Sequence, residues 1–161
     1  SWHILTFVVC SIDRPEGYRR DASSALSSGP INSQEPCSNM TERGFKQMMA
    51  EANAVIDTIS VVDAMKLIDD KTVSFIDVRE KHEREAAHIP GSYHAARGFL
   101  ELIAAKDGPM HQEVFASGNH LILYCGTGGR SALSAKTLLD MGIRNVSSMA
   151  GGFAAWKELN E

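Results

Sequence analysis

The chain has few cysteines, no long apolar segment and no excess of basic residues. Its three cysteines, Cys10, Cys37 and Cys125, are widely spaced, which fits neither a disulfide framework nor a zinc site of paired cysteines. The six histidines show no ligand spacing, and no apolar run approaches the ~20 residues of a transmembrane helix. A net charge of −4 gives no basic surface for nucleic acid. We therefore expect a reducing, cytoplasmic location, with no metal, no nucleic acid and no membrane partner.

The composition divides the chain near residue 40. Residues 1–39 hold a short apolar run, without a preceding Lys or Arg, and then a stretch of Ser, Asn, Gly and Pro. Such a segment is typical of a disordered leader or linker. Its origin stays open, since it is a targeting peptide, an artificially appended segment or upstream sequence. Residues 40–161 have the apolar content of one folded domain.

Apolar spacing predicts alternating helices and strands from residue 43 onward. Helices are expected at 43–56, 60–68, 80–86, 97–105, 131–141 and 153–159. Strands are expected around Ile59 and at 73–78, 93–95, 121–124 and 146–149. This alternation indicates an α/β fold: a mainly parallel central sheet of about five strands with helices on both faces.

One glycine-rich loop carries the strongest chemical signal, Cys125-Gly126-Thr127-Gly128-Gly129-Arg130. It follows a predicted buried strand and precedes a predicted helix. Backbone N–H groups and a helix N-terminus in such a loop stabilise a thiolate and lower its pKa. The loop therefore predicts a nucleophilic cysteine, although a lone cysteine also serves as a small buried apolar residue.

A second polar group is expected at the same edge of the sheet. Asp77 and Arg79 end the predicted strand 73–78, and Cys125 ends the strand 121–124. The carboxyl ends of parallel strands form the usual site in an open α/β sheet. We expect Asp77 and Arg79 to pair and support the loop, because a carboxylate close to the thiolate would raise the thiol's pKa.

Four segments, in this order, resemble a single-domain rhodanese. They are Asp77-Val78-Arg79-Glu80, His88-Ile89-Pro90-Gly91-Ser92, Cys125 to Ser131, and Gly151-Gly152-Phe153-Ala154-Ala155-Trp156, and the resemblance covers about residues 58–160. It implies a rhodanese-like fold and a sulfurtransferase without a cofactor. Cys125 would take a sulfane sulfur from thiosulfate, another small sulfur-donor anion or a protein persulfide, and pass it to a thiol or cyanide acceptor.

The resemblance also implies roles for the loop residues. The N–H groups of Gly126, Thr127, Gly128, Gly129 and Arg130 would stabilise the charge on the transferred sulfur. Arg130 has two candidate roles, attracting an anionic donor or anchoring the loop. Ser131 is expected to cap the helix that follows.

Three functions stay open at this stage. The first is sulfur transfer. The second is phosphatase or arsenate reductase chemistry, but those enzymes place five residues between the cysteine and the arginine, and this loop has four. The third is a non-catalytic rhodanese-like interaction module, which usually lacks the cysteine.

The loop also lacks the extra basic residues of some thiosulfate-specialised members, which favours a protein persulfide or another small thiol species as the donor.

Overall fold

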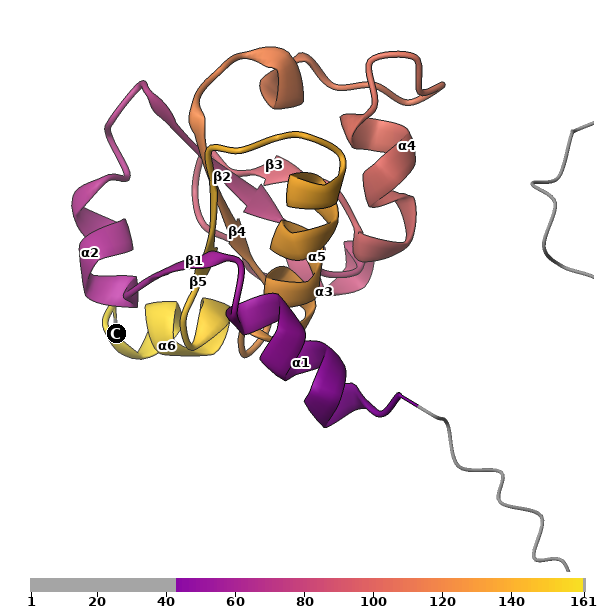
Figure 1. Ribbon diagram of the computed structural model, residues 1–161. Coiled ribbons are helices and arrows are strands. Elements are labelled where there is room, and N and C mark those ends of the chain that lie inside the picture. The colour runs from indigo at the N-terminus through magenta and orange to yellow at the C-terminus, as the bar shows by residue number, and fades with distance from the viewer. Residues whose placement is uncertain (1–42, 161) are drawn as a thin grey trace, which may run out of the picture. The chain divides into compact units, whose positions relative to one another are not determined.

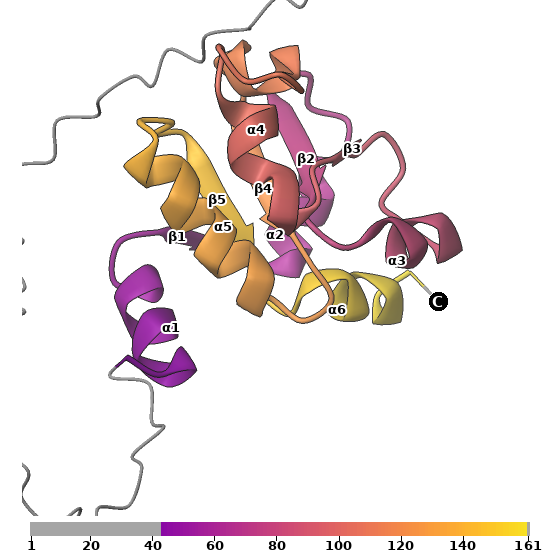
Figure 2. The same ribbon diagram turned by 90° about the vertical axis from the view of Figure 1, so that its right-hand side faces the viewer.

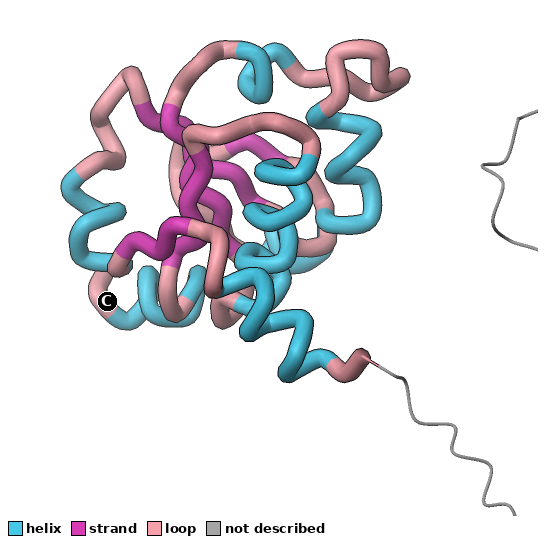
Figure 3. Tube along the Cα trace, viewed as in Figure 1, coloured by secondary structure: helices cyan, strands magenta, loops and turns pink. Residues whose placement is uncertain are grey.

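The structure is a computed structural model that describes residues 43–160, in which strands and helices alternate along the chain (Figure 3). The helices are α1 (Phe45–Asn53), α2 (Val61–Lys66), α3 (Lys81–Ala86), α4 (Leu100–Ala104), α5 (Gly129–Asp140) and α6 (Gly152–Glu158), with 3-10 turns η1 (Arg97–Phe99) and η2 (Glu113–Ala116). The strands are β1 (Asp57–Ile59), β2 (Val73–Asp77), β3 (Tyr93–His94), β4 (His120–Tyr124) and β5 (Val146–Met149). Across the described segment, no helix has both the length and the apolar character that a membrane crossing needs. The predictions for residues 1–39 and for a boundary at residue 40 lie outside the described residues.

The five strands form one sheet in the order β1-β5-β4-β2-β3, and every neighbouring pair is parallel. The predicted α/β fold with a parallel sheet of about five strands is therefore confirmed. In the register of β2 and β4, Asp77 lies opposite Tyr124. Just beyond them the Val78 N–H donates to the Tyr124 carbonyl at 3.0 Å. The chain thus leaves β2 and β4 side by side at the carboxyl ends of these two strands.

Helices cover both faces of the sheet. α1, α4 and α5 lie together on one face, and α2 and α6 on the other (Figures 1 and 2). Side chains along β4 alternate between the two cores: Leu121 and Leu123 pack with the α5 side, while Ile122 and Tyr124 pack with the α6 side. Because both faces of β4 are buried, its residues from Leu121 to Tyr124 are continuously apolar, which explains the apolar run at 121–124 in the sequence.

A local signal explains where α2 begins, while two other segments differ from the prediction. Ser60 opens α2 as predicted, because its side chain accepts a hydrogen bond from the Asp63 N–H at 3.1 Å. The segment predicted as one helix at 97–105 is instead a 3-10 turn followed by α4, with Gly98 inside the turn. The turn η2 was not expected from the sequence, and it buries Val114 and Phe115 in the α5-side core.

Candidate functional site

The Cys125–Arg130 loop joins the carboxyl end of β4 to the first turn of α5. Gly128 precedes the helix with φ of +109°, a left-handed conformation that favours glycine. The Thr127 side chain is exposed, and Gly129 is the first residue of α5. The free N–H groups at the start of this 12-residue helix therefore lie next to the cysteine.

The Cys125 side chain is enclosed by hydrogen-bond donors. The residue is 1% exposed, the Gly128 N–H donates to Sγ at 3.1 Å, and the Ser131 hydroxyl lies 3.7 Å from Sγ. Burial on its own would raise the pKa of this thiol, but the N–H groups of Ser131, Gly128 and Thr127 and the Ser131 hydroxyl outweigh burial and lower it. The loop therefore favours a thiolate, as the sequence predicts.

A second hydroxyl supports Ser131 from β5. The Ser148 hydroxyl donates to Ser131 Oγ at 2.9 Å, and both residues are buried. The predicted capping role of Ser131 is wrong, because Gly128 is the N-cap residue of α5 and no side chain caps this helix. Ser131 lies in the first turn of α5, and its hydroxyl proton has two possible acceptors, the Gly128 carbonyl at 3.0 Å and Sγ. The hydrogen bond from Ser148 polarises the Ser131 hydroxyl toward Sγ when the thiolate forms.

We expect Ser148→Ala to weaken this stabilisation of the thiolate. At a pH below the thiol's pKa, alkylation of Cys125 by iodoacetamide would slow about twofold to tenfold, the equivalent of one hydrogen bond. The matched control is Ser147→Ala, since Ser147 is equally buried but pairs with His120 at 2.8 Å. A pH profile of alkylation that shifts equally in both variants would contradict this role of Ser148.

The start of α6 holds the loop from the opposite side. The Phe153 N–H donates to the Cys125 carbonyl at 2.7 Å, and the Ala154 N–H donates to the Gly126 carbonyl at 3.0 Å. Gly152 allows this approach, because a Cβ on it would lie 2.5 Å from the Cys125 carbonyl oxygen and 2.7 Å from that of Gly126. Its φ is +60°, which adds a second reason for glycine.

Gly152→Ala is therefore expected to displace the loop. Gly118→Ala serves as its control, because Gly118 also has positive φ, +81°, but nothing lies within 4 Å of its added Cβ. We expect Gly152→Ala to cost about 1–3 kcal/mol more than the control in the free energy of unfolding, measured by urea titration. Equal costs in the two variants would show that the close approach of α6 to the loop is unimportant.

Arg130 is held by a carboxylate from another helix. Its guanidinium donates to Glu83 of α3 through two hydrogen bonds, Nη1 to Oε2 at 2.6 Å and Nη2 to Oε1 at 2.7 Å. These bonds outweigh partial burial and lower the pKa of Glu83 to about 2, so the pair stays charged until the pH falls toward that value. Of the two candidate roles of Arg130, this geometry favours anchoring the loop.

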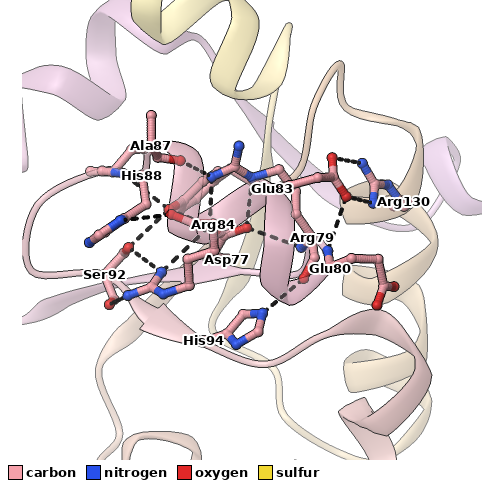
Figure 4. A network of polar contacts seen from close by, with 12 residues as sticks. Asp77, Arg79, Glu80, Glu83, Arg84, Ala87, His88, Ser92, His94 and Arg130 are labelled. Atoms are coloured by element: carbon pink, nitrogen blue, oxygen red, sulfur yellow. Dashed lines mark hydrogen bonds and ion pairs between the residues drawn. The ribbon is translucent and has the colours of Figure 1, made fainter.

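Asp77 and Arg79 form a buried ion pair at the carboxyl end of β2 (Figure 4). Arg79 Nε donates to Oδ1 of Asp77 at 3.0 Å and Nη2 donates to Oδ2 at 2.8 Å. Burial would raise the pKa of Asp77, but the hydrogen bonds from Arg79 outweigh it and lower the pKa. The Arg79 guanidinium also lies 4.3 Å from the centre of the Phe153 ring, on α6. The pair thus connects β2 to the helix that supports the loop.

Three further members of this network were not expected from the sequence. Tyr124 Oη donates to Asp77 Oδ2 at 3.0 Å and lies 2.9 Å from Ser92 Oγ. Arg84 donates from Nη1 to the same Ser92 hydroxyl at 2.9 Å and lies 3.5 Å from Asp77 Oδ2 (Figure 4). The sequence signal for these contacts is Tyr124 at the end of a buried strand, because a buried tyrosine hydroxyl needs a hydrogen-bond partner.

The remaining arginine at this edge, Arg97, is also engaged. It donates to the Glu101 carboxylate at 3.1 Å and to the Thr137 hydroxyl at 3.2 Å. Arg79, Arg84, Arg97 and Arg130, which follow β2, β3 and β4, thus each have an acidic partner. Across the part of the chain that the structure describes, no cluster of His, Cys, Asp and Glu is arranged to hold a metal ion.

Comparison with known proteins identifies the family. The model of the rhodanese-like domain matches residues 60–159. The chain belongs to the rhodanese-like domain family. The sequence resemblance is thereby confirmed, and the Cys125 loop, the Asp77–Arg79 pair and the Gly152 turn all fall within the matched rhodanese-like region.

The proteins that this chain is similar to differ in their described activities. The chain is 30% identical over 99 residues to a thiosulfate sulfurtransferase, GlpE, of Pseudoalteromonas translucida, covering 62% of this chain and 87% of that protein. It is 30% identical over 114 residues to a putative sulfur carrier protein, YrkF, of Bacillus subtilis, covering 71% of this chain but only 57% of YrkF. A solved structure from Rhodopseudomonas palustris, RPA3614, is 36% identical with a TM-score of 0.73, covering 78% of this chain and 96% of that one. RPA3614 is described as a protein of unknown function and a possible tyrosine phosphatase.

Proposed function

We propose that this chain is a sulfurtransferase that carries a sulfane sulfur as a persulfide on Cys125. One observation carries the proposal: the Cys125 sulfur is buried at the end of β4 and accepts a hydrogen bond from the Gly128 N–H at 3.1 Å. A loop that surrounds a single sulfur atom with N–H donors suits a thiolate, and equally the terminal sulfur of a persulfide. Membership of a family with thiosulfate sulfurtransferases supports the same chemistry.

The proposed reaction has two steps. The Cys125 thiolate attacks the outer sulfur of the donor, an S–S bond forms to Sγ, and the donor's S–S bond breaks. With thiosulfate, the electron pair of that bond leaves with sulfite. In the second step an acceptor thiolate or cyanide attacks the outer persulfide sulfur, which releases the Cys125 thiolate and a new persulfide or thiocyanate. No change in total oxidation state is needed, and the cysteine itself carries the group.

The loop residues take supporting roles in this proposal. The N–H groups between Gly126 and Arg130 stabilise the negative charge that moves to the outer sulfur. Arg130 and Glu83 hold the end of the loop at the first turn of α5. Asp77 and Arg79 support it from behind, as does Ser131 through its hydroxyl. The donor is a small sulfur anion or a protein persulfide, and a reducing, cytoplasmic-type compartment keeps the thiol free.

Phosphatase chemistry is the second candidate, because the 36% identical structure RPA3614 is described as a possible tyrosine phosphatase. Two features argue against it here. The loop has four residues between Cys125 and Arg130, which leaves fewer N–H donors for three phosphate oxygens. Arg130 is also paired with Glu83 through both terminal nitrogens, so a phosphoryl group would have to compete with that carboxylate for the charge of Arg130.

One paired assay separates the two candidates. The chain is incubated with thiosulfate and cyanide while thiocyanate is measured, and in parallel with p-nitrophenyl phosphate while nitrophenol is measured. We expect thiocyanate to form and the phosphate ester to remain intact. Release of nitrophenol without thiocyanate would reject sulfur transfer and favour the phosphatase.

A further inference from the structure

Helix α1 precedes the matched family region, which begins at residue 60. It nevertheless packs on α5, the helix that the Cys125–Arg130 loop opens (Figures 1 and 2). Ala52 is fully buried, and Met49 packs against the same core as Leu138. These contacts fix the position of α1 relative to the loop.

The first residue of α1 lies at the loop itself. A methyl group added to Gly129 would lie 3.7 Å from Cζ of Phe45, so the edge of the aromatic ring reaches the first residue of α5. The Phe45 side chain is nevertheless 64% exposed. An exposed aromatic ring beside a reactive loop presents apolar surface that a substrate's hydrocarbon group would cover.

The charges at this edge of the sheet point to the same kind of substrate. Arg130 is paired with Glu83, Arg79 with Asp77, and Arg97 with Glu101. A dianionic inorganic donor therefore meets backbone N–H groups, while Arg130 and Arg97 are each paired with a carboxylate and Arg79 and Arg84 share Asp77. A donor that carries an organic group gains contact with Phe45 and needs less positive charge.

We propose that Phe45 determines donor specificity by contacting the organic group of the sulfur donor, so that the chain prefers a sulfur donor that bears a hydrocarbon group. This inference rests on the proposed sulfur transfer and names its substrate class. With an organic thiosulfonate as donor, the Cys125 thiolate bonds to the outer sulfur and the donor's S–S bond breaks. Its electron pair leaves with the sulfinate, whose organic group stays against the Phe45 ring until release.

The test compares two thiosulfonates that differ only in the organic group. Benzenethiosulfonate and methanethiosulfonate are used as donors with cyanide as acceptor, and the ratio of their kcat/KM values is measured. We expect Phe45→Ala to lower the benzene-to-methane ratio about fivefold to tenfold, the range of a well-placed aromatic contact. Phe45→Leu, which keeps apolar surface without the ring, is expected to restore part of the ratio.

Phe99→Ala is the matched control. Phe99 is also an exposed aromatic residue, 51% exposed, but it lines a separate cavity of about 300 Å³ with Ile103 and Met110, and no loop residue lines that cavity. We expect the ratio of kcat/KM values in this variant to stay within about twofold of the wild type, because Phe99 does not contact the donor. Circular dichroism checks that all variants are folded.

Each other outcome overturns the proposal. An unchanged ratio in Phe45→Ala would show that the ring does not meet the organic group. A fall of the benzene-to-methane ratio in Phe99→Ala alone would show that the organic group of the donor binds in the cavity lined by Phe99 instead. A wild-type chain that forms thiocyanate from neither thiosulfonate nor thiosulfate would reject the proposed function itself, and with it this inference.

Discussion

Cys125→Ser is expected to reduce thiocyanate formation by roughly 10³-fold or more, because no other group in the loop can carry the sulfur. A serine hydroxyl forms no persulfide and is not ionised at neutral pH. The side chain is nearly the same size and is 1% exposed, with N–H donors around it, so the fold is expected to persist. The rate is measured with thiosulfate and cyanide, together with a circular dichroism spectrum.

The matched control replaces the other two thiols. A Cys10→Ser, Cys37→Ser double variant makes the same substitution in the segment that precedes the domain. We expect it to keep the wild-type rate. Sulfur transfer that survives in Cys125→Ser but disappears in the double variant would reject Cys125 as the nucleophile.

Asp77→Asn is expected to cause a large loss of stability, about 3–5 kcal/mol, because it leaves a buried guanidinium without its counter-ion. Asp77 is fully buried and Arg79 is 5% exposed, so water cannot replace the lost charge. Asparagine keeps only one of the two oxygens that accept from Arg79, Arg84 and Tyr124. The midpoint of thermal unfolding would fall by roughly 10–20 °C.

The control for this change is Asp107→Asn, which removes the same charge at an exposed position and is expected to change stability by less than about 0.5 kcal/mol.

The pH dependence of stability gives a second test. Because the pKa of folded Asp77 is lowered, the stability that it contributes is present above its unfolded pKa and is lost as pH falls through the folded value. Asp77→Asn would flatten this part of the acid unfolding curve, and equal curves for wild type and variant would contradict the role of the pair.

The fold was predictable because its signals are local. The central strand β4 is a nearly continuous apolar run, the amphipathic helices repeat their apolar residues every three or four positions, and the glycine-rich loop marks the junction of β4 and α5. The Cys125 site and the Asp77–Arg79 pair were expected for the same reason, since both follow directly from strand ends. The 3-10 turn at Arg97–Phe99 was not, because Gly98 weakens a helix without revealing which turn replaces it.

The rest of the site depends on contacts between residues far apart in the sequence. Glu83 is 47 residues from Arg130, and the sequence offers many acidic residues as alternative partners. Phe45 reaches Gly129 only because α1 packs on α5. The sequence therefore does not separate the two candidate roles of Arg130, whereas its contact with Glu83 favours anchoring the loop.

The intact mass of the chain after incubation with thiosulfate tests the persulfide itself. We expect an addition of about 32 Da, one sulfur atom, located on Cys125 by peptide mapping and removed by cyanide. Cys125→Ser would show no addition. An unmodified wild-type chain, or a sulfur found only on Cys10 or Cys37, would contradict sulfur transfer through Cys125.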